Sequence, residues 1–476
     1  MQQKTTIGDM YNERIYHILI DRFSTGDDLL DKKLAYSYEI DFMGGNLNGI
    51  IKKLDYIKEL GFSAIWLSPI FKGNDYHGYH VTDFFEVDPH FGSLKELKRL
   101  IRKAHECDIK IIIDIVPNHV YETHPFFLDT KQNPKSKYRD WFVWTKSGDY
   151  LKFLTYKWLP KLNTRNPEVQ EYLLEVMDFY LNIGIDGFRV DHAYGLAREF
   201  AEKALKYIID KKGKNVHYFG ECWLDPQMLS KYYVIKTLWL LNRGFSWSLY
   251  IRLQRILFRN DFVVGQNIRE KMLPYIISYF NGLLDFYTNQ LIRKNINSPE
   301  NLIMWVIKAR NLSESVDKPL YKFLDNHDME RFLTVVNNDL NLMKIALAIE
   351  YLAFEDPVIV YYGTEIPLGQ PKRFSEFENH RDVLSRIFMP WNEKQELREY
   401  LKILNAIKSQ MISSKVEIVR NPGTAIKIDI ETKDKNYLVI INPSRKETIL
   451  DSSYEDVETG LNLRYVPPMR AKIFEA

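Results

Sequence analysis

The chain of 476 residues has little cysteine and no strong excess of either charge. Its two cysteines, Cys107 and Cys222, are too few for a disulfide framework, and their spacing fits no metal-binding motif. We therefore expect both to be small buried apolar residues. The 65 lysines and arginines against 63 aspartates and glutamates leave a formal net charge of +2, so no overall field attracts nucleic acid or an anionic membrane.

The sequence also lacks long apolar runs. No stretch approaches the roughly 18 apolar residues that a membrane-spanning helix needs. Charged residues at Lys4, Asp9, Glu13, Arg14 and Asp21 interrupt the N-terminal segment, which is unlike the apolar core of a signal peptide. These absences predict a soluble protein in the cytoplasm. A mature secreted protein whose signal had been removed would look the same.

Short apolar runs alternate with amphipathic stretches over about 390 residues, which is the rhythm of repeated βα units. Helical spacing of apolar residues is seen at 46–60, 93–107 and 167–183, and Ser93 with Glu96 resembles a capping box. The near-continuous apolar run at 109–116 fits a strand buried on both faces. Strands are expected at 14–20, 63–67, 109–116, 187–191, 216–221, 322–325 and 357–362. The pattern predicts an α/β protein built on a (β/α)8 barrel.

Some stretches depart from this rhythm. Residues 120–165 are rich in Lys, Asp, Tyr and Trp, and residues 227–317 look like one long helical region. Near the C-terminus the pattern changes to short alternating segments, which is typical of antiparallel strands. We therefore predict a barrel formed by residues 1–119 and 166–405, an inserted subdomain at 120–165 after the third strand, and a C-terminal antiparallel β-sandwich domain at 406–476.

Several predicted strands end in acidic or histidine residues. The active sites of such barrels lie at the C-terminal ends of the strands, so these side chains are expected on one face. Each motif alone is weak, because acidic residues at strand ends often serve as caps or surface ion pairs. The motifs are Asp114 with Asn118 and His119, Arg189 with Asp191, Glu221, and His327 with Asp328.

Hydrolysis of a glycosidic bond needs two carboxyl groups, and a third carboxylate can stabilise the positive charge on the sugar. Arg189 lies two residues before Asp191 on the same strand face, so it would keep the pKa of Asp191 low, as a nucleophile requires. Glu221 has no adjacent cation in the sequence. Burial and nearby carboxylates would then raise its pKa, as a general acid requires.

Taken in order, the segments DIVPNHV, GFRVDHA, FGECW and FLDNHD resemble the four signature regions of the α-amylase superfamily, glycoside hydrolase family 13. GFSAIWLSPI and the YHGYHVTDFFEVDPHFG that follows resemble the second-strand region and its loop. The resemblance implies a retaining hydrolase with Asp191 as nucleophile, Glu221 as general acid/base and Asp328 as transition-state stabiliser. It further implies contacts with the glucose at the cleaved bond from His77, Tyr79, His119, Arg189, His327, Asp382 and Arg386.

The segment WLPKLN at 158–163 is similar to the MPKLN segment of the neopullulanase, cyclomaltodextrinase and maltogenic amylase subgroup. Trp223, two residues after the acid, resembles an aromatic residue of that subgroup that stacks on the leaving-side glucose, although packing in the core would also explain it. The subgroup usually has an additional N-terminal β domain that supports dimers. The chain begins almost at its first barrel strand, so we expect that domain to be absent and leave both monomer and homodimer open.

Many α-amylases carry Lys–His three and four residues after the nucleophile, where they help to bind sugar and calcium. Tyr194 and Gly195 stand at those positions in this chain, which weakens one ligand position of the usual calcium site. The chemistry requires no cofactor, and a structural calcium ion stays an open expectation. Side chains with oxygens suited to calcium are Asn118, Asp27, Asp31 and Asn46.

The leading hypothesis is therefore an enzyme that cleaves α-1,4-glucosidic bonds in starch, maltooligosaccharides or cyclodextrins by double displacement. The alternative is a 4-α-glucanotransferase on the same scaffold, because a sugar hydroxyl can intercept the glycosyl-enzyme instead of water. A third hypothesis, a non-catalytic relative used for binding or transport, predicts the loss of an acid and a membrane anchor, and the sequence shows neither.

Overall fold

The computed structural model describes residues 9–144, 148–153, 156–223, 273, 276–376, 380–391 and 397–476. The chain forms two compact units. The first unit comprises Met1–Ser68, His90–Ile112 and Tyr287–Ala476, and the second comprises Pro69–Pro89 and Ile113–Phe286.

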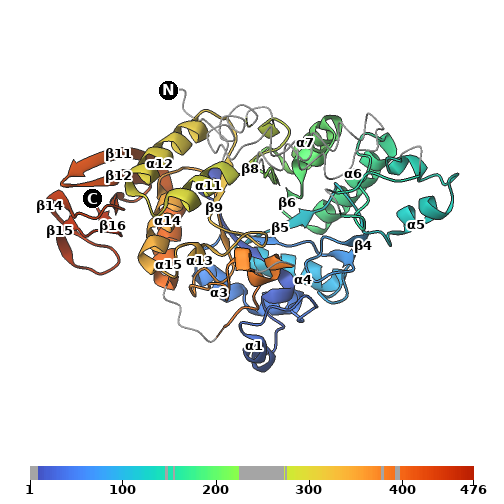
Figure 1. Ribbon diagram of the computed structural model, residues 1–476, viewed down its shortest axis with the longest axis horizontal. Coiled ribbons are helices and arrows are strands. Elements are labelled where there is room, and N and C mark those ends of the chain that lie inside the picture. The colour runs from blue at the N-terminus through green and yellow to red at the C-terminus, as the bar shows by residue number, and fades with distance from the viewer. Residues whose placement is uncertain are drawn as a thin grey trace. The chain divides into compact units, whose positions relative to one another are not determined.

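Eight strands close into one barrel in the order β1-β10-β9-β8-β7-β6-β5-β2, which confirms the predicted (β/α)8 fold (Figure 1). Strand pairs such as β1 with β2 and β6 with β7 are parallel, and the residues of these strands are almost all buried, as expected from their apolar runs. The bounds are β1 (Arg14–Ile18), β2 (Ala64–Leu67), β5 (Lys110–Ile115), β6 (Gly187–Val190), β7 (His217–Gly220), β8 (Leu283–Leu284), β9 (Leu320–Phe323) and β10 (Val358–Tyr361).

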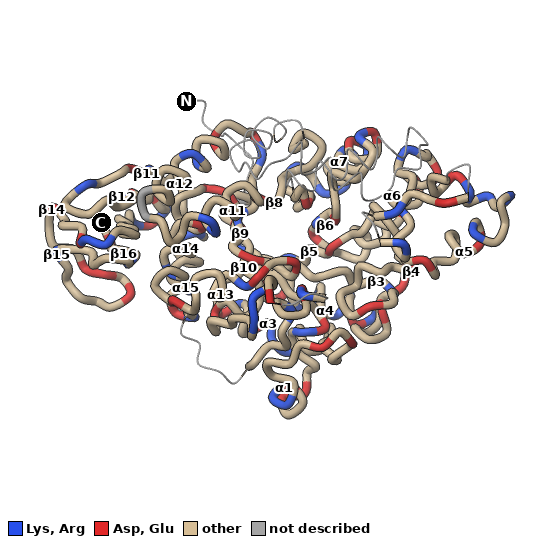
Figure 2. Tube along the Cα trace, viewed as in Figure 1, with Lys and Arg blue, Asp and Glu red and all other residues tan. Residues whose placement is uncertain are grey.

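Helices follow the barrel strands in both units. The first unit contains α1 (Asp28–Leu34), α2 (Leu47–Lys52), α3 (Leu54–Glu59), α4 (Leu94–Glu106), α12 (Pro299–Glu314), α13 (Phe332–Val335), α14 (Leu340–Leu352) and α15 (Arg398–Gln410). The second unit contains α5 (Pro125–Gln132), α6 (Pro167–Ile183), α7 (Arg198–Lys212) and the hairpin of β3 (Phe71–Gly73) and β4 (Val81–Val87). Basic and acidic residues are interspersed along α7 (Figure 2), whereas the charged residues of α6 are all acidic.

The helix ends agree with the sequence signals. Ser93 and Glu96 form the predicted capping box of α4, in which the Glu96 carboxylate accepts a hydrogen bond of 2.8 Å from the Ser93 amide. The helix expected at 46–60 is instead two short helices, α2 and α3, that meet at Lys53. None of the helices in the described part of the chain combines the length and the apolar character that a membrane crossing requires.

The long helical region predicted at 227–317 contains a barrel strand that the sequence did not reveal. Residues 224–272 and 274–275 lie outside the described residues, but the remainder contains the barrel strand β8, followed by α11 (Phe286–Asn295) and α12. β8 is only two residues long and pairs with β7 through Gly220 and Leu283. Periodicity cannot reveal so short a strand, because two residues show no repeat.

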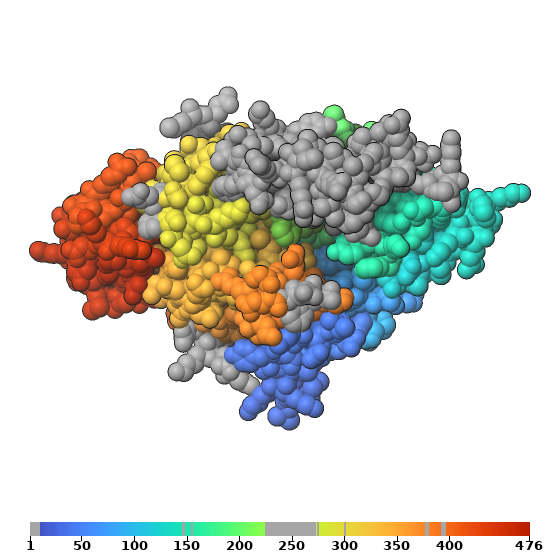
Figure 3. Space-filling view, in the orientation of Figure 1, coloured from blue at the N-terminus to red at the C-terminus, as the bar shows by residue number. Residues whose placement is uncertain are grey.

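The C-terminal residues form antiparallel sheets, as predicted. The larger sheet has the order β11-β12-β13-β16, and β14 pairs with β15 (Figure 1). Leu450 and Leu463 of the small sheet pack on a core that includes Leu438 and Phe474 of the large one, and the atoms of this region form one block in Figure 3. The bounds are β11 (Met411–Asn421), β12 (Gly423–Thr432), β13 (Asn436–Asn442), β14 (Thr448–Glu455), β15 (Asn462–Val466) and β16 (Arg470–Glu475). The domain limits given above stay a prediction.

Gly187 provides a test of how closely β6 and β7 approach each other. A Cβ atom at this position would lie 2.1 Å from the backbone oxygen of His217. We expect Gly187→Ala to lower the unfolding free energy by about 3 kcal/mol, because the paired strands must separate to admit the methyl group. The control is Gly369→Ala, whose Cβ would meet side-chain atoms and no backbone atom among its nearest neighbours, with Oδ1 of Asn338 the nearest at 3.0 Å. Equal urea midpoints for the two variants would contradict the tight strand contact.

Candidate active site

Arg189 lies on β6 in the second unit, and its side chain is 0% exposed. Its Nη1 atom donates hydrogen bonds to both carboxylate oxygens of Asp114, each at 2.8 Å, and to Oδ1 of Asp191 at 2.9 Å. Its Nη2 atom lies 3.1 Å from Oε2 of Glu221. Asp114 lies in β5, Asp191 follows β6 and Glu221 follows β7. One guanidinium group therefore joins carboxylates from three neighbouring barrel strands.

Arg189 remains charged in this buried place. Burial lowers the pKa of the guanidinium, but the negative charges of Asp114, Glu221 and Asp191 raise it, and the net result is a pKa well above the ordinary value. A buried ion pair is strongly destabilising when one partner is removed, because the other is left without compensation. The carboxylates thus depend on this cation.

The sequence shows no cation next to Glu221, but the structure places the guanidinium of Arg189 beside it. The parallel register of β6 and β7 pairs Val190 with Gly220, so that Arg189 and Glu221 come into contact across the strands. Oε2 of Glu221 also accepts a hydrogen bond of 2.9 Å from the backbone N–H of His192. The Glu221 side chain is 12% exposed, so it is held on one side and accessible on the other.

Tyr79 is tied to the same network. Its hydroxyl donates a hydrogen bond of 2.7 Å to Oδ2 of Asp114, and Nη1 of Arg189 lies 3.4 Å from that hydroxyl. The backbone N–H of Tyr79 donates to Nδ1 of His77 at 3.1 Å. Tyr79, His77, Arg189 and Asp191 were all named from the sequence. The structure brings these four residues together within the second unit.

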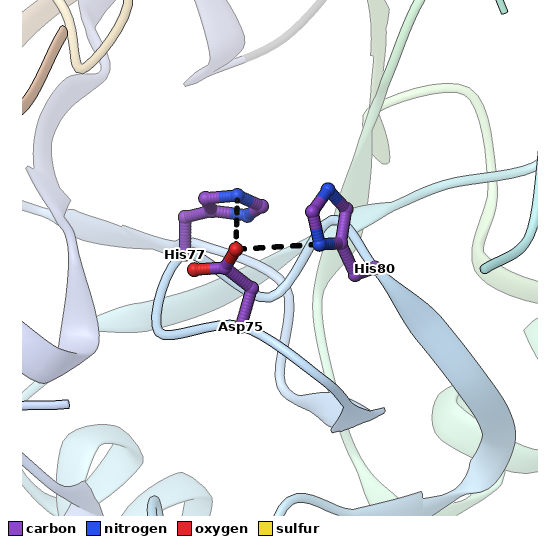
Figure 4. Close-up of side chains that lie close together, drawn as sticks. All are labelled: Asp75, His77 and His80. Carbon is purple, nitrogen blue, oxygen red and sulfur yellow. Dashed lines mark ion pairs between the residues drawn. The ribbon is translucent and has the colours of Figure 1, made fainter. Parts of the chain in front are cut away.

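Asp75 lies between two histidines (Figure 4). Its Oδ2 atom is 3.4 Å from Nε2 of His77 and 3.3 Å from Nδ1 of His80. Burial raises the pKa of Asp75, but the hydrogen bonds of the two rings lower it, and the net pKa falls far below the usual range. Because Nδ1 of His77 accepts a hydrogen bond from the backbone, the ring proton sits on Nε2 and faces Asp75. The three side chains lie close enough to share a metal ion, but a proton already fills the His77 position.

His119 and His192 are neutral in this environment. Burial lowers the pKa of His119 to about 3, and the positive charge of Lys161 contributes in the same direction. Burial also lowers the pKa of His192 well below its ordinary value. The rings of both lie against Phe153, with centroids 4.6 Å away in each case. Near neutral pH these imidazoles can orient a ligand through hydrogen bonds but do not add charge.

The remaining predicted residues form a second cluster, in the first unit. Oδ1 of Asp328 accepts a hydrogen bond of 2.9 Å from Nη2 of Arg386, and Oδ2 lies 3.1 Å from Nε2 of His327. Nη1 of Arg386 pairs with Oδ2 of Asp382 at 2.7 Å, and Nε donates to the backbone oxygen of His327 at 2.9 Å. Asp328, His327, Arg386 and Asp382 are thus joined to one another within this unit.

Trp223 has a packing partner. Its ring stacks on Phe286, with centroids 5.1 Å apart and planes 13° apart. This contact favours the core-packing interpretation of Trp223, and its contact with a sugar stays a prediction.

Sequence reasoning gave no role to Asp114, Asp75 or His80. Asp114 carried a signal, since it is a carboxylate within the near-continuous apolar run at 109–116, and such a group needs a buried partner. No sequence pattern marked Asp75 or His80. Their contacts depend on the turn that places Asp75 beside His77 and His80.

The N-terminal candidates for calcium serve the chain's own hydrogen bonds. Asp27 caps α1 by accepting from the amides of Leu29 and Leu30, and Asn46 caps α2 by accepting from Gly49. Asp31 accepts from the amide of Thr25 at 2.7 Å and from the hydroxyls of Ser24 and Thr25 at 2.6 Å each. Calcium needs six to eight oxygen ligands, and these oxygens do not fit that need because donors of the protein already occupy them.

The dependence of the carboxylates on Arg189 can be tested by pH. In Arg189→Met the three buried carboxylates repel one another, which raises their pKa values in the folded state above those in the unfolded state. We expect a loss of about 3–5 kcal/mol at pH 8 that shrinks toward pH 5, because protonation removes the repulsion. Thermal unfolding across pH measures this. Arg198→Met, which removes an exposed pair with Glu202, is the control with little effect. A deficit that does not change with pH would contradict the network.

Comparison with known proteins places this geometry in context. The family model described as the catalytic domain of alpha amylase matches residues 17–149 and 145–221. The chain is 31% identical over 457 residues to "Alpha-amylase 2" of Dictyoglomus thermophilum, covering 94% of this chain and 72% of that protein. It is 30% identical over 492 residues to a cyclomaltodextrinase of Thermoanaerobacter pseudethanolicus, covering 97% and 77%. A crystal structure of an Anoxybacillus alpha-amylase superposes with a TM-score of 0.74 at 26% identity and covers 98% of each chain.

The barrel, the carboxylates at its strand ends and these similarities agree with one another. The matched segments include the β5, β6 and β7 strands that carry Asp114, Arg189 and Glu221. The chain belongs to the α-amylase family and is an α-amylase-type glycoside hydrolase.

Proposed function

We propose that the protein cleaves α-1,4-glucosidic bonds in maltooligosaccharides, cyclodextrins or starch, with retention of the α configuration. The observation that carries the proposal is the single guanidinium of Arg189 that holds Asp191 and Glu221 on neighbouring strand ends. Retaining hydrolysis uses one carboxylate as nucleophile and one carboxyl as acid, and the two must keep fixed positions relative to each other. A shared cation supplies that constraint.

Asp191 serves as the nucleophile in this proposal. Arg189 holds Oδ1 at 2.9 Å and favours the ionised form, so Oδ2 attacks the anomeric carbon. The bond from that carbon to the leaving oxygen breaks as the ester to Asp191 forms. The side chain is 10% exposed, so bulk water has little access to the ionised oxygen. Asp191 displaces the leaving group from the anomeric carbon, and water then displaces Asp191. Each step inverts the configuration of that carbon, so the two together restore it.

Glu221 serves as the acid in the first step and as the base in the second. Oε2 is held by Arg189 and by the backbone N–H of His192, so we place the transferred proton on Oε1. That proton passes to the leaving oxygen when the glycosidic bond breaks. Glu221, now ionised, then takes a proton from the water that attacks the ester.

Asp114 and Asp328 have different roles. Asp114 accepts from Arg189 and Tyr79 and acts as a positioning residue that fixes the guanidinium and the phenol together. Asp328, paired with Arg386 and His327 in its own unit, is assigned to stabilise the positive charge on the sugar. That assignment rests on the match of FLDNHD to the fourth signature region of the family.

The proposed substrates rest on the subgroup resemblance and on exposed aromatic residues. Tyr156 and Trp158 are 42% and 40% exposed, and their ring centroids lie 5.2 Å apart in the segment after β5. Exposed aromatic faces suit the apolar C–H faces of glucose. The names of two relatives, an alpha-amylase and a cyclomaltodextrinase, agree with linear and cyclic α-glucans. A cytoplasmic location and the choice between monomer and homodimer stay predictions.

Substitution of the acid is the direct test of the mechanism. Glu221→Gln keeps an oxygen for the His192 amide but cannot donate the proton, so turnover of a maltooligosaccharide should fall by about 10³-fold or more. Thermal unfolding should stay near that of the wild type. The matched control is Glu202→Gln on the exposed face of α7, where activity should not change. Turnover close to wild type in Glu221→Gln would refute the assignment.

The stereochemistry and the products test the reaction itself. Proton NMR during hydrolysis should show the α-anomer of maltose first, because two displacements restore the configuration. Initial release of the β-anomer would exclude Asp191 as nucleophile. With soluble starch, pullulan, β-cyclodextrin and concentrated maltotriose side by side, we expect glucose and maltose as the main products. From maltotriose as the only substrate, products longer than maltotriose would favour the 4-α-glucanotransferase alternative.

A further inference from the structure

Lys161, in the WLPKLN segment, is held in place by backbone pairing within the second unit. His119 and Lys161 form an antiparallel bridge. The amide of Leu162 donates to the Asn118 carbonyl at 3.0 Å, and the amide of Val120 donates to the Pro160 carbonyl at 3.1 Å. The segment therefore runs beside the chain that leaves β5, which fixes the starting point of the Lys161 side chain.

The ammonium group of Lys161 contacts two oxygens that come from different barrel strands. It donates hydrogen bonds to Oδ1 of Asn118, which follows β5, and to the backbone oxygen of Gly195, which follows β6. Asn118 is 0% exposed, and Gly195 is buried. One positive charge thus ties the inserted segment to the ends of two strands.

Gly195 is needed for this arrangement. A Cβ atom at its position would lie 2.4 Å from Oδ1 of Asn118 and 2.4 Å from the ring of His192. No larger residue could bring its backbone oxygen to the ammonium without moving Asn118. The family's usual histidine is therefore incompatible with the packing seen here, and the glycine and the lysine belong to one arrangement.

We infer that the ammonium of Lys161 takes the structural role that a bound calcium ion has in calcium-dependent members of the family. Asn118 was the expected side-chain ligand, and its oxygen already accepts from a cation of the protein. A divalent ion beside Lys161 would meet strong repulsion at low dielectric, and two of its oxygens would be taken. The second unit is accordingly held together without metal at this place. The inference depends on family membership and not on the proposed substrate.

Calcium dependence of the wild-type protein is the first test. We expect the unfolding temperature to be the same in EDTA and in millimolar calcium, and metal analysis of the purified protein to show well below one calcium ion per chain. An unfolding temperature that falls in EDTA and is restored by calcium would overturn the inference. These measurements do not require activity, so they stay informative even if the proposed substrates are wrong.

Substitution of the lysine is the second test. Lys161→Met keeps most of the stem but leaves the buried oxygens of Asn118 and Gly195 without their donor, so the unfolding temperature should fall by about 4 °C or more. The matched control is Lys152→Met in the same segment, where the lysine pairs with the exposed Asp149. An equal, small shift in both variants would show that the ammonium has no structural role. If Lys161→Met does not fold, the wild-type calcium measurements still decide the question.

Discussion

The second unit depends on one buried cation. Arg189 contacts Asp114, Asp191 and Glu221, and three largely buried carboxylates so close together would not all stay ionised without it. Its place follows from the barrel, because the register of β6 and β7 brings the three strand ends to the same guanidinium. Gly187 helps by letting these strands pair closely. The geometry of Asp191 and Glu221 is thus a consequence of strand pairing and charge balance together.

Local sequence patterns predicted contacts between residues of one strand and missed contacts between residues of different strands. The contact of Arg189 with Asp191 could be predicted, because residues two apart share a strand face. The contact of Arg189 with Glu221 could not, because it depends on the register of two strands far apart in sequence. The strand Leu283–Leu284 was missed for a related reason, since its two residues form a strand only by pairing with Gly220. Asp114 was visible as a buried carboxylate but had no identifiable partner.

A second cation complements the first. Arg189 balances carboxylates, whereas Lys161 donates hydrogen bonds to the neutral oxygens of Asn118 and Gly195. The positive charge of Lys161 lowers the pKa values of His119 and His192 further than burial alone would. The two histidines therefore stay neutral near neutral pH and add no charge of their own.

The WLPKLN segment combines an anchored end with an exposed one. Lys161 fixes one end to the chain after β5, while Trp158, three residues earlier, is 40% exposed beside Tyr156. A change at Trp158 alters a surface ring and leaves the ammonium contacts in place, whereas a change at Lys161 disturbs Asn118 and the strand end itself. Under the proposed function, substrate preference can therefore vary at the exposed end without loss of the chemistry at Arg189. This separation explains why sequence motifs identify the reaction more readily than the preferred glucan.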